Sequence, residues 1–451
     1  MPVSLWHLYN LRESPFFQEQ LTSDPDARYP IELFVGRRAE VERLVSVIRQ
    51  KAESSSRQTV QGPPGIGKST LIQQVKSRVA ADRILSHPTA VSVAHEDTTQ
   101  AVLLRILRYV YATILGNAPN LAIADRPPMV TAKQLVMAFQ SRAGGGGLNF
   151  PAVGGVTLNV STQYVTPAAA IELVVPPVLA ELSALVREQM GASGVLVHID
   201  NLENLSDEGA ETAARIIRDL RDPVFMAEGY HFVLAGTNEA VRVAVGSTRQ
   251  VRDVFSMPRP LKPLSLAEVK ELLERRYAHL RVDSAQPVRP PATDHAIADL
   301  HALFDGNVRG FLLALEDAAQ ALIEFGGAGA EPMSREQIRF VLRGRTADGV
   351  EANLDATDIR HLSRMAEARL FDGFTQTDIA RACGVNQSAA SKIGRRLEDA
   401  GYLSSSDAPT PGKPGRPVRR YHATALVRLA FDGPPPGHAP PALLHRGSGT
   451  N

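Results

Sequence analysis

The chain has only one cysteine, Cys383, among its 451 residues. A single thiol excludes an intramolecular disulfide and a zinc site built from several cysteines, and we expect Cys383 to be a core residue. No apolar run approaches the roughly 20 residues that span a bilayer. The first residues also lack the basic start and apolar stretch of a signal peptide. We therefore expect a cytoplasmic protein with no membrane partner.

An excess of charge of either sign is also missing. The 49 basic and 48 acidic residues leave a net charge of +1, and the hydrophobic set makes up 44% of the chain. This composition is typical of a globular protein and excludes a polycation over the whole length. A nucleic-acid surface would have to come from local clustering of charge. The length predicts two to four domains.

Strands and helices alternate between residues 36 and 258. Continuous apolar runs at Val195–Ile199 and His231–Ala235 are typical of strands buried on both faces of a parallel sheet. We therefore predict an α/β fold with a three-layer core built on a parallel sheet. His198 in the first run is interpreted as a core residue or a support for neighbouring ligands. A helical stretch from Ala168 to Met190 is expected to break near Pro176-Pro177.

After Pro263 the pattern becomes wholly helical, and Ser265 to Glu268 forms a capping box that opens the first helix. Trp6 and His7 are expected to pack within an N-terminal arm. We divide the chain into this arm (1–33), an α/β core (34–258) with an inserted β-hairpin at about 143–166, a helical lid (259–345), a winged helix-turn-helix domain (346–431) and a disordered tail (432–451).

A glycine-rich turn between a predicted strand and a predicted helix carries the strongest motif, G-x-x-x-x-G-K-[ST]. The glycines let successive backbone N–H groups point at one anion, and the helix adds its positive end. Lys68 supplies a mobile charge for the β- and γ-phosphates, and the Ser69 hydroxyl is a ligand for Mg²⁺. We predict ATP and Mg²⁺ as cofactors, with the nucleotide bound by Gly62, Pro63, Gly65, Ile66, Gly67, Lys68, Ser69 and Thr70.

Polar side chains follow both apolar strands. Asp200 ends the first of them, where a second carboxylate is needed to hold Mg²⁺, so Ser69 and Asp200 form the predicted metal site. Asn238 follows the second strand in Gly236-Thr237-Asn238, where it can orient the attacking water. The pattern indicates a P-loop ATPase.

These motifs together resemble an AAA+ ATPase of the origin-recognition initiator and STAND type. The resemblance covers about residues 34–345 and includes Phe34-Val35-Gly36-Arg37 and Gly306-Asn307-Val308-Arg309, which is similar to the sensor-2 motif of a helical lid. It implies that Phe34 and Val35 lie near the adenine and that Arg309 reaches the γ-phosphate. It also implies a homo-oligomer with an arginine finger, for which Arg249 and Arg252 are the candidates.

One departure from that family concerns hydrolysis. The family usually has glutamate directly after the Walker B aspartate, whereas this chain has Asn201, and its first acid is Glu203. Either Glu203 serves as the catalytic base, or hydrolysis is slow and ATP acts as a switch ligand.

The region after residue 355 has the pattern of a helix-turn-helix followed by a wing. Residues 386–431 contain eight basic and three acidic residues, a local charge of +5. Such a surface favours duplex DNA as a partner. The expected contacts are Gln387, Ser388, Ser391, Lys392, Arg395 and Arg396 on the third helix, and Lys413, Arg416, Arg419 and Arg420 on or beside the wing.

Two hypotheses of function follow. The first is an ATP-dependent DNA-binding AAA+ ATPase that assembles on duplex DNA under nucleotide control, with protein partners in a DNA-processing complex. Its role would be initiator-like, in a mobile element or in defence. The second is a STAND-type regulator of transcription or signalling, in which ATP or ADP sets an on or off state.

Overall fold

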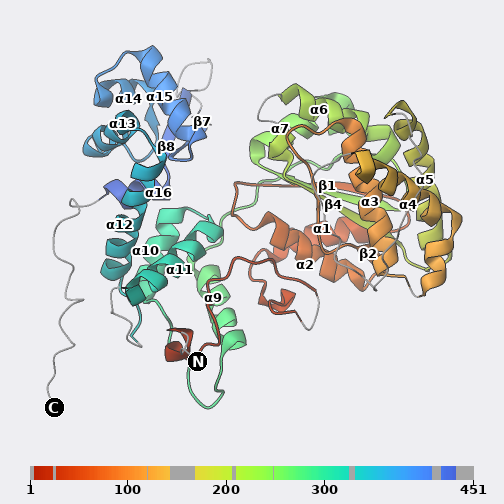
Figure 1. The fold of residues 1–451 in the computed structure, drawn as a ribbon, viewed down its shortest axis with the longest axis horizontal. Coiled ribbons are helices and arrows are strands. Elements are labelled where there is room, and N and C mark those ends of the chain that lie inside the picture. The colour runs from red at the N-terminus through yellow and green to blue at the C-terminus, as the bar shows by residue number, and fades with distance from the viewer. Residues whose placement is uncertain are drawn as a thin grey trace. The chain divides into compact units, whose positions relative to one another are not determined.

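The computed structural model describes residues 5–23, 27–118, 120–142, 168–205, 210–246, 248–324, 331–408 and 418–432. The expected hairpin at 143–166 and the expected tail beyond 432 lie outside these ranges. The chain divides into two compact units (Figure 1). One unit is residues 19–262, and the other combines the first 18 residues with those after Lys262.

A parallel sheet is the centre of the first unit. Its strands lie in the order β1 (Ser56–Gln61), β5 (Tyr230–Gly236), β4 (Gly194–Asp200) and β2 (Ile84–Ser86), and β3 (Val91–Ser92) also pairs with β4. The register puts Val60 beside Ala235 and Val197 beside Phe232. Because the strands are parallel, β1, β4 and β5 all end at one edge of the sheet. The two apolar runs are therefore buried neighbouring strands, as expected.

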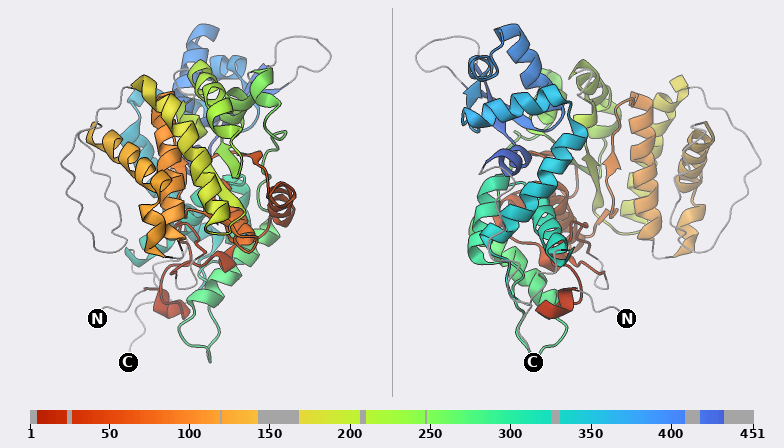
Figure 2. Two further views of the ribbon diagram at one scale, coloured as in Figure 1. Left: turned by 90° about the vertical axis from the view of Figure 1, so that its right-hand side faces the viewer. Right: turned by 60° about the vertical axis from the view of Figure 1, so that its left-hand side comes forward.

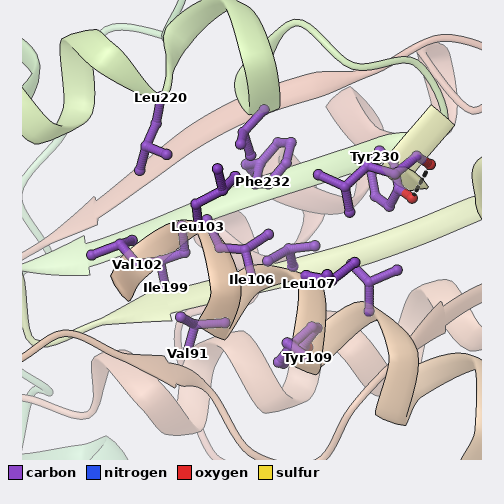
Figure 3. Packing of buried hydrophobic residues seen from close by; sticks show 14 of the residues in the cluster. Val91, Val102, Leu103, Ile106, Leu107, Tyr109, Ile199, Leu220, Tyr230 and Phe232 are labelled. Carbon is purple, nitrogen blue, oxygen red and sulfur yellow. Dashed lines mark hydrogen bonds between the residues drawn. The ribbon is translucent and has the colours of Figure 1, made fainter. Parts of the chain in front are cut away.

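Helices cover both faces of this sheet. Helices α1 (Arg38–Gln50) and α2 (Lys68–Ala80) pack on one face, and their buried residues meet Val60, Leu196 and Val233. The other face carries α3 (Thr99–Gly116), α4 (Pro127–Arg142), α5 (Ala168–Glu188), α6 (Ala210–Asp219) and α7 (Asn238–Gly246). Figure 3 shows Leu103, Ile106 and Leu107 of α3 close to β4 and β5. The three-layer core is confirmed. Short helices η2 (Ile31–Leu33), η3 (Leu121–Asp125), η4 (Leu202–Leu205), η5 (Arg221–Phe225) and α8 (Arg249–Arg252) complete the unit.

Helix α5 corrects one expectation. It runs without interruption through Pro176 and Pro177, where the sequence predicted a break. A proline inside a helix removes a backbone donor and costs about 3 kcal/mol. Burial offsets that cost here, because Val175, Val178 and Leu182 lie in the core. The helix continues because its apolar face is held by its neighbours.

Helices α9 (Leu266–Leu280), α10 (Asp294–Phe304), α11 (Val308–Glu324) and α12 (Arg335–Asn353) begin the second unit after Pro263. The capping box at the start of α9 is present, since the Ser265 hydroxyl accepts from the Glu268 N–H and the Glu268 carboxylate accepts from the Ser265 N–H. Figure 2 shows α12 extending from these helices to the C-terminal part. The wholly helical pattern expected after Pro263 is therefore present.

The C-terminal part contains α13 (Ala356–Glu367), β6 (Phe374–Thr375), α14 (Gln376–Cys383), α15 (Gln387–Asp399), β7 (Leu403–Ala408), β8 (Val418–Ala423) and α16 (Ala425–Phe431). Strands β6, β8 and β7 form an antiparallel sheet in that order. Thr375 and Asn386 cap α14 and α15, and Gly384 makes the turn between them with φ of 68°. Cys383 is buried in the core of this part, as expected. The order of elements is the one expected for a winged helix-turn-helix.

The first residues of the chain are fixed to the helices of the second unit. The guanidinium of Arg276 on α9 donates to the carbonyls of Pro15 and Phe17 at 3.0 and 2.8 Å, and it stacks over the Phe17 ring. Asn10 Nδ2 donates to the carbonyl of Asp283 at 2.9 Å, and Leu11 is fully buried. The chain therefore passes between the two units twice, near residue 18 and near residue 262.

Candidate nucleotide-binding site

The glycine-rich turn joins the end of β1 to the start of α2. Gly65 and Gly67 adopt left-handed φ values of 77° and 94°, which glycine adopts readily. A Cβ atom at Gly62 would lie 3.1 Å from Ile66 Cγ2, so the Ile66 side chain would have to shift to admit a larger residue there. The turn ends at the N-terminus of α2, where unpaired backbone N–H groups favour an anion. This is the conformation that the motif predicts.

Lys68 and Arg37 both contact carbonyl oxygens of this turn. The buried Lys68 ammonium donates to Gly62 at 2.9 Å and to Pro63 at 3.3 Å. Arg37 is buried, has φ of 53°, and donates from Nη2 to the Ile66 carbonyl. Val35 is buried as well, and Phe34 packs against the core of α1 and α2. Arg37 therefore fixes the segment that contains Phe34 and Val35 to the phosphate-binding turn.

The structure brings the two predicted magnesium ligands together. Ser69 Oγ donates to Asp200 Oδ2 at 2.8 Å, and Asp200 Oδ1 accepts from the Asn201 N–H at 2.9 Å. Hydroxyl and carboxylate oxygens are the ligands that Mg²⁺ prefers, and nucleotide phosphates commonly complete its shell. Both side chains are partly accessible beside the turn. Ser69 and Asp200 therefore fit the ion.

Two buried polar side chains lie behind Asp200, namely His198 and Lys76. Residues 196, 198 and 200 share one face of β4 because side chains alternate along a strand. Lys76 is two turns from Ser69 on α2, on the side that covers this face. His198 Nε2 lies 3.5 Å from Asp200 Oδ2. The Lys76 ammonium donates to the carbonyls of His87 and Thr89 at 2.7 and 3.0 Å.

Burial controls the ionisation of both groups. It lowers the pKa of His198 to about 3, with a further contribution from Lys76, so the imidazole is neutral near pH 7. Burial also lowers the pKa of Lys76 to about 7, while the Asp200 carboxylate acts in the opposite direction. The sequence analysis did not single out Lys76. Its spacing from Ile72 and Val79 on the apolar face of α2 is the signal that could have shown its burial.

Glu203 and Thr237 meet at the ends of β4 and β5. The Glu203 carboxylate accepts from the Thr237 N–H at 3.2 Å, and the Thr237 hydroxyl accepts from the Ala240 N–H at the start of α7. Asn238 is exposed on the first turn of α7. Asn201 has φ of 63° and donates from its amide to Ser92 Oγ at 2.9 Å. Glu203 thus brings a carboxylate to the edge of the sheet where Asp200 also lies.

The family comparison agrees with this geometry. Residues 33–227 match the family model described as the AAA ATPase domain. These residues form an AAA ATPase domain. The match includes the glycine-rich turn, Asp200 and Glu203. No curated protein matches the sequence of the chain.

Several solved structures are similar to most of the chain at low identity. The ORC2 protein of Aeropyrum pernix is 15% identical, with 93% of this chain and 97% of that chain covered and a TM-score of 0.49. The ORC1 protein of the same organism, solved in complex with DNA, is 16% identical, with 88% and 92% covered and a TM-score of 0.46. The RuvB branch migration motor of Thermotoga maritima is 14% identical, with 85% and 92% covered and a TM-score of 0.40. Similarity of this degree does not assign a function.

Arg249 and Arg252, the candidates for an arginine finger, and Arg309, expected to act from the lid, lie outside the matched AAA ATPase domain. Arg249 and Arg252 are exposed on α8, and Arg249 lies 3.5 Å from the Asp253 carboxylate. Arg309 is exposed on the first turn of α11, in the second unit. Gly306 precedes that helix with φ of 84°, and a Cβ there would lie 2.6 Å from Pro263 Cβ. A tight turn therefore sets the start of α11.

Helix α15 presents the side chains expected to contact DNA, outside the AAA ATPase domain. Gln387, Ser388, Lys392 and Arg395 are exposed, and Ser391 is half-buried. Ile393 and Leu397 face the core, and Gly394 lets α15 lie directly on Tyr421 of β8. Within the part of the chain that the structure describes, neither Lys392 nor Arg395 forms an ion pair.

The other basic candidates of this part have protein partners. Arg396 binds both carboxylate oxygens of the buried Asp358 on α13, through Nε at 2.6 Å and through Nη2. Arg419 donates to Glu398 and Ser405, and Arg420 donates to the Gly373 carbonyl at 2.7 Å. Lys413 and Arg416 lie outside the described residues. In the described ranges no helix is long and apolar enough to cross a membrane.

Proposed function

We propose that the protein is an ATP-dependent DNA-binding ATPase in which nucleotide controls assembly on duplex DNA. The observation that carries the nucleotide half is the 2.8 Å contact between Ser69 and Asp200 beside a turn shaped for phosphate. Two side chains 131 residues apart meet only because β1 and β4 end at the same edge of the sheet. Their oxygens suit the magnesium ion that accompanies ATP.

Each residue of the site has a defined task in this proposal. The backbone N–H groups of residues 65–69 and the Lys68 ammonium bind the phosphates. Ser69 and Asp200 would hold Mg²⁺, which neutralises charge on the phosphate oxygens when it is bound. Glu203 orients the attacking water and accepts its proton, and the Thr237 N–H fixes the position of the Glu203 carboxylate.

The DNA half of the proposal rests on α15. Residues 387–395 of this helix expose amide, hydroxyl, ammonium and guanidinium groups, which bind base edges and phosphates in a major groove. Lys392 and Arg395 have no ion-pair partner among the described residues, so no protein contact has to break before they bind DNA. Arg396, Arg419 and Arg420 already bind protein groups, and we assign them mainly to the support of this surface.

A second function is favoured by the environment of Asn201. The residue directly after Asp200 carries no carboxylate, and its amide is engaged with Ser92. If Glu203 is not the base, turnover is slow and the protein is a STAND-type switch that changes state with ATP or ADP. The measured turnover number distinguishes this switch from the ATPase.

The direct test is binding of a fluorescent duplex by anisotropy with ATP, with ADP and without nucleotide. We expect the tightest binding with ATP, and a larger assembly on DNA by sedimentation. The Lys68→Ala variant should lose the effect of ATP and retain the nucleotide-free affinity. Affinity that does not change with nucleotide in the wild type would refute the proposed coupling.

A further inference from the structure

His198 is a buried polar group that the proposed function leaves without a task. Its side chain is fully buried, and neither ring nitrogen has a hydrogen-bond partner among the described residues. Leaving a buried donor or acceptor unpaired costs about 1–3 kcal/mol. An apolar residue would fill this position in β4 without that cost, since Val195, Leu196, Val197 and Ile199 surround it in sequence. A histidine at this position therefore lowers the stability of the fold unless its ring interacts with a nearby group.

The carboxylate of the magnesium site lies close to this ring. His198 Nε2 lies 3.5 Å from Asp200 Oδ2, which is also the oxygen that accepts from Ser69 Oγ. The His198 ring approaches this oxygen from inside the core, whereas the Ser69 hydroxyl approaches it from α2. The other carboxylate oxygen accepts from the Asn201 N–H. Asp200 is thus fixed by Ser69 and Asn201, and His198 lies just beyond hydrogen-bond geometry on a third side.

The tautomer of His198 follows from this arrangement. A neutral imidazole has one N–H donor and one nitrogen lone pair. A lone pair on Nε2 would face the negative Oδ2 atom, whereas an N–H there is attracted to it. The hydrogen therefore belongs on Nε2, which turns that nitrogen into a donor aimed at Asp200.

We propose that His198 is a positioning residue of the magnesium site, and that its Nε2–H orients the Asp200 carboxylate toward the ion. The inference rests on the proposed function, because it assigns the ion to Ser69 and Asp200. Partners that orient a ligating group commonly change metal affinity by 10- to 100-fold when they are removed. The role differs from that of Lys76, whose ammonium is held by the carbonyls of His87 and Thr89.

The test measures how strongly Mg²⁺ improves the binding of a fluorescent, non-hydrolysable ATP analogue. Wild type, His198→Leu and His198→Gln are titrated with the analogue in excess Mg²⁺ and in EDTA. Direct titration with Mn²⁺, followed by electron paramagnetic resonance, reports the metal affinity itself. His231→Gln is the matched control, because His231 is equally buried on β5 but pairs with Leu196, four residues before Asp200.

We expect His198→Leu to bind the analogue normally in EDTA and to lose about tenfold in metal affinity. His198→Gln can place an amide N–H near the position of Nε2 and should recover most of the loss. His231→Gln should leave the metal affinity unchanged. Equal metal affinity in His198→Leu and wild type would overturn the inference, whereas a wild type without nucleotide binding would overturn the proposed function instead.

A measurement on the wild type covers the case in which the leucine variant does not fold. Long-range ¹H–¹⁵N correlation spectra of ¹⁵N-histidine-labelled protein distinguish the two neutral tautomers. We expect the imidazole to carry its hydrogen on Nε2, and we expect its Nε2 signal to move on addition of Mg²⁺ and the ATP analogue. A hydrogen on Nδ1, or signals unaffected by the ligand, would overturn the assignment.

Discussion

At the scale of single residues, Lys68 is the group on which nucleotide binding depends most. Its ammonium is buried and held by the carbonyls of its own turn, so it needs little reorganisation to meet a phosphate. We predict that Lys68→Ala weakens ATP binding by at least about tenfold, because a charge-assisted contact to the phosphates is lost. Titration with a fluorescent ATP analogue measures this. Lys262→Ala, at an exposed lysine, is the control, and equal affinity in all three proteins would contradict the prediction.

Glu203 carries the second residue-scale prediction. Glu203→Gln keeps the shape of the side chain and removes the basic carboxylate. We expect ATP to stay bound while turnover falls at least about a hundredfold, the lower range for loss of a general base. Phosphate release under saturating ATP measures the change, with the exposed Glu239→Gln as the matched control. Normal turnover in Glu203→Gln would show that another group is the base.

The lowered pKa of Lys76 predicts that the stability of the protein depends on pH. Its pKa is lowered from 10.5 to about 7 in the folded protein. Between these two values the unfolded chain holds a proton that the folded chain has released, so the free energy of unfolding rises with pH. We expect this rise, up to about 1.4 kcal/mol per pH unit, to be absent in Lys76→Met. Urea unfolding at pH 7 and pH 9.5 tests it, with Lys262→Met as the control. A difference between wild type and Lys76→Met that is constant over this range would disprove the shift.

At the scale of secondary-structure elements, α15 separates two arginines that are adjacent in sequence. Arg395 is exposed and has no ion pair with the described residues, whereas Arg396 is bound to the buried Asp358. We predict that Arg395→Ala weakens DNA binding, by roughly 1–3 kcal/mol at a preferred site, and leaves stability unchanged. Arg396→Ala should lower the free energy of unfolding by about 1–3 kcal/mol, since Asp358 loses its main partner. Anisotropy measures DNA affinity, and urea unfolding measures stability. The same affinity and the same stability in both variants would refute the distinction between the two arginines.

The elements also show how far the sequence determines the fold. The buried strands β4 and β5, the phosphate-binding turn and the capping box at Ser265 were predicted because each depends on local pattern. The continuity of α5 through Pro176 and Pro177 was not predicted, because tertiary packing there outweighs the tendency of proline to end a helix. The strand order also depends on contacts distant in sequence.

In the nucleotide-binding site, too, some contacts were predicted from the sequence and others were not. Ser69 and Asp200 were paired in advance because the motif and the end of a parallel strand bring two ligands to one edge. The contact of Arg37 with the Ile66 carbonyl was not foreseen, because it depends on tertiary structure. The burial of Lys76 was also not foreseen, although its spacing from Ile72 and Val79 indicates it. The contact between Glu203 and Thr237 likewise needed the register of β4 against β5.

At the scale of the whole molecule, we propose that the nucleotide cycle depends on Arg309 in the second unit. The resemblance to AAA+ lids gives it the role of a sensor. We predict that Arg309→Ala binds an ATP analogue with normal affinity and fails to assemble with it. Native mass spectrometry with the analogue measures assembly, and Arg335→Ala, which removes an exposed arginine paired with Asp299, is the control. Normal ATP-driven assembly of Arg309→Ala would remove it from this role.

The contact between the first residues and α9 has a consequence for biosynthesis. Residues 5–17 leave the ribosome about 260 residues before Arg276 and Asp283, which hold them. At 5–20 residues per second, that delay is on the order of tens of seconds. The sheet of residues 19–262 can be completed in this time, whereas Trp6, Tyr9, Leu11 and Phe16 stay without the helices that bury them. Residues 5–17 thus reach their final contacts after the sheet can form, and until then they are an apolar segment that a chaperone at the ribosomal exit can bind.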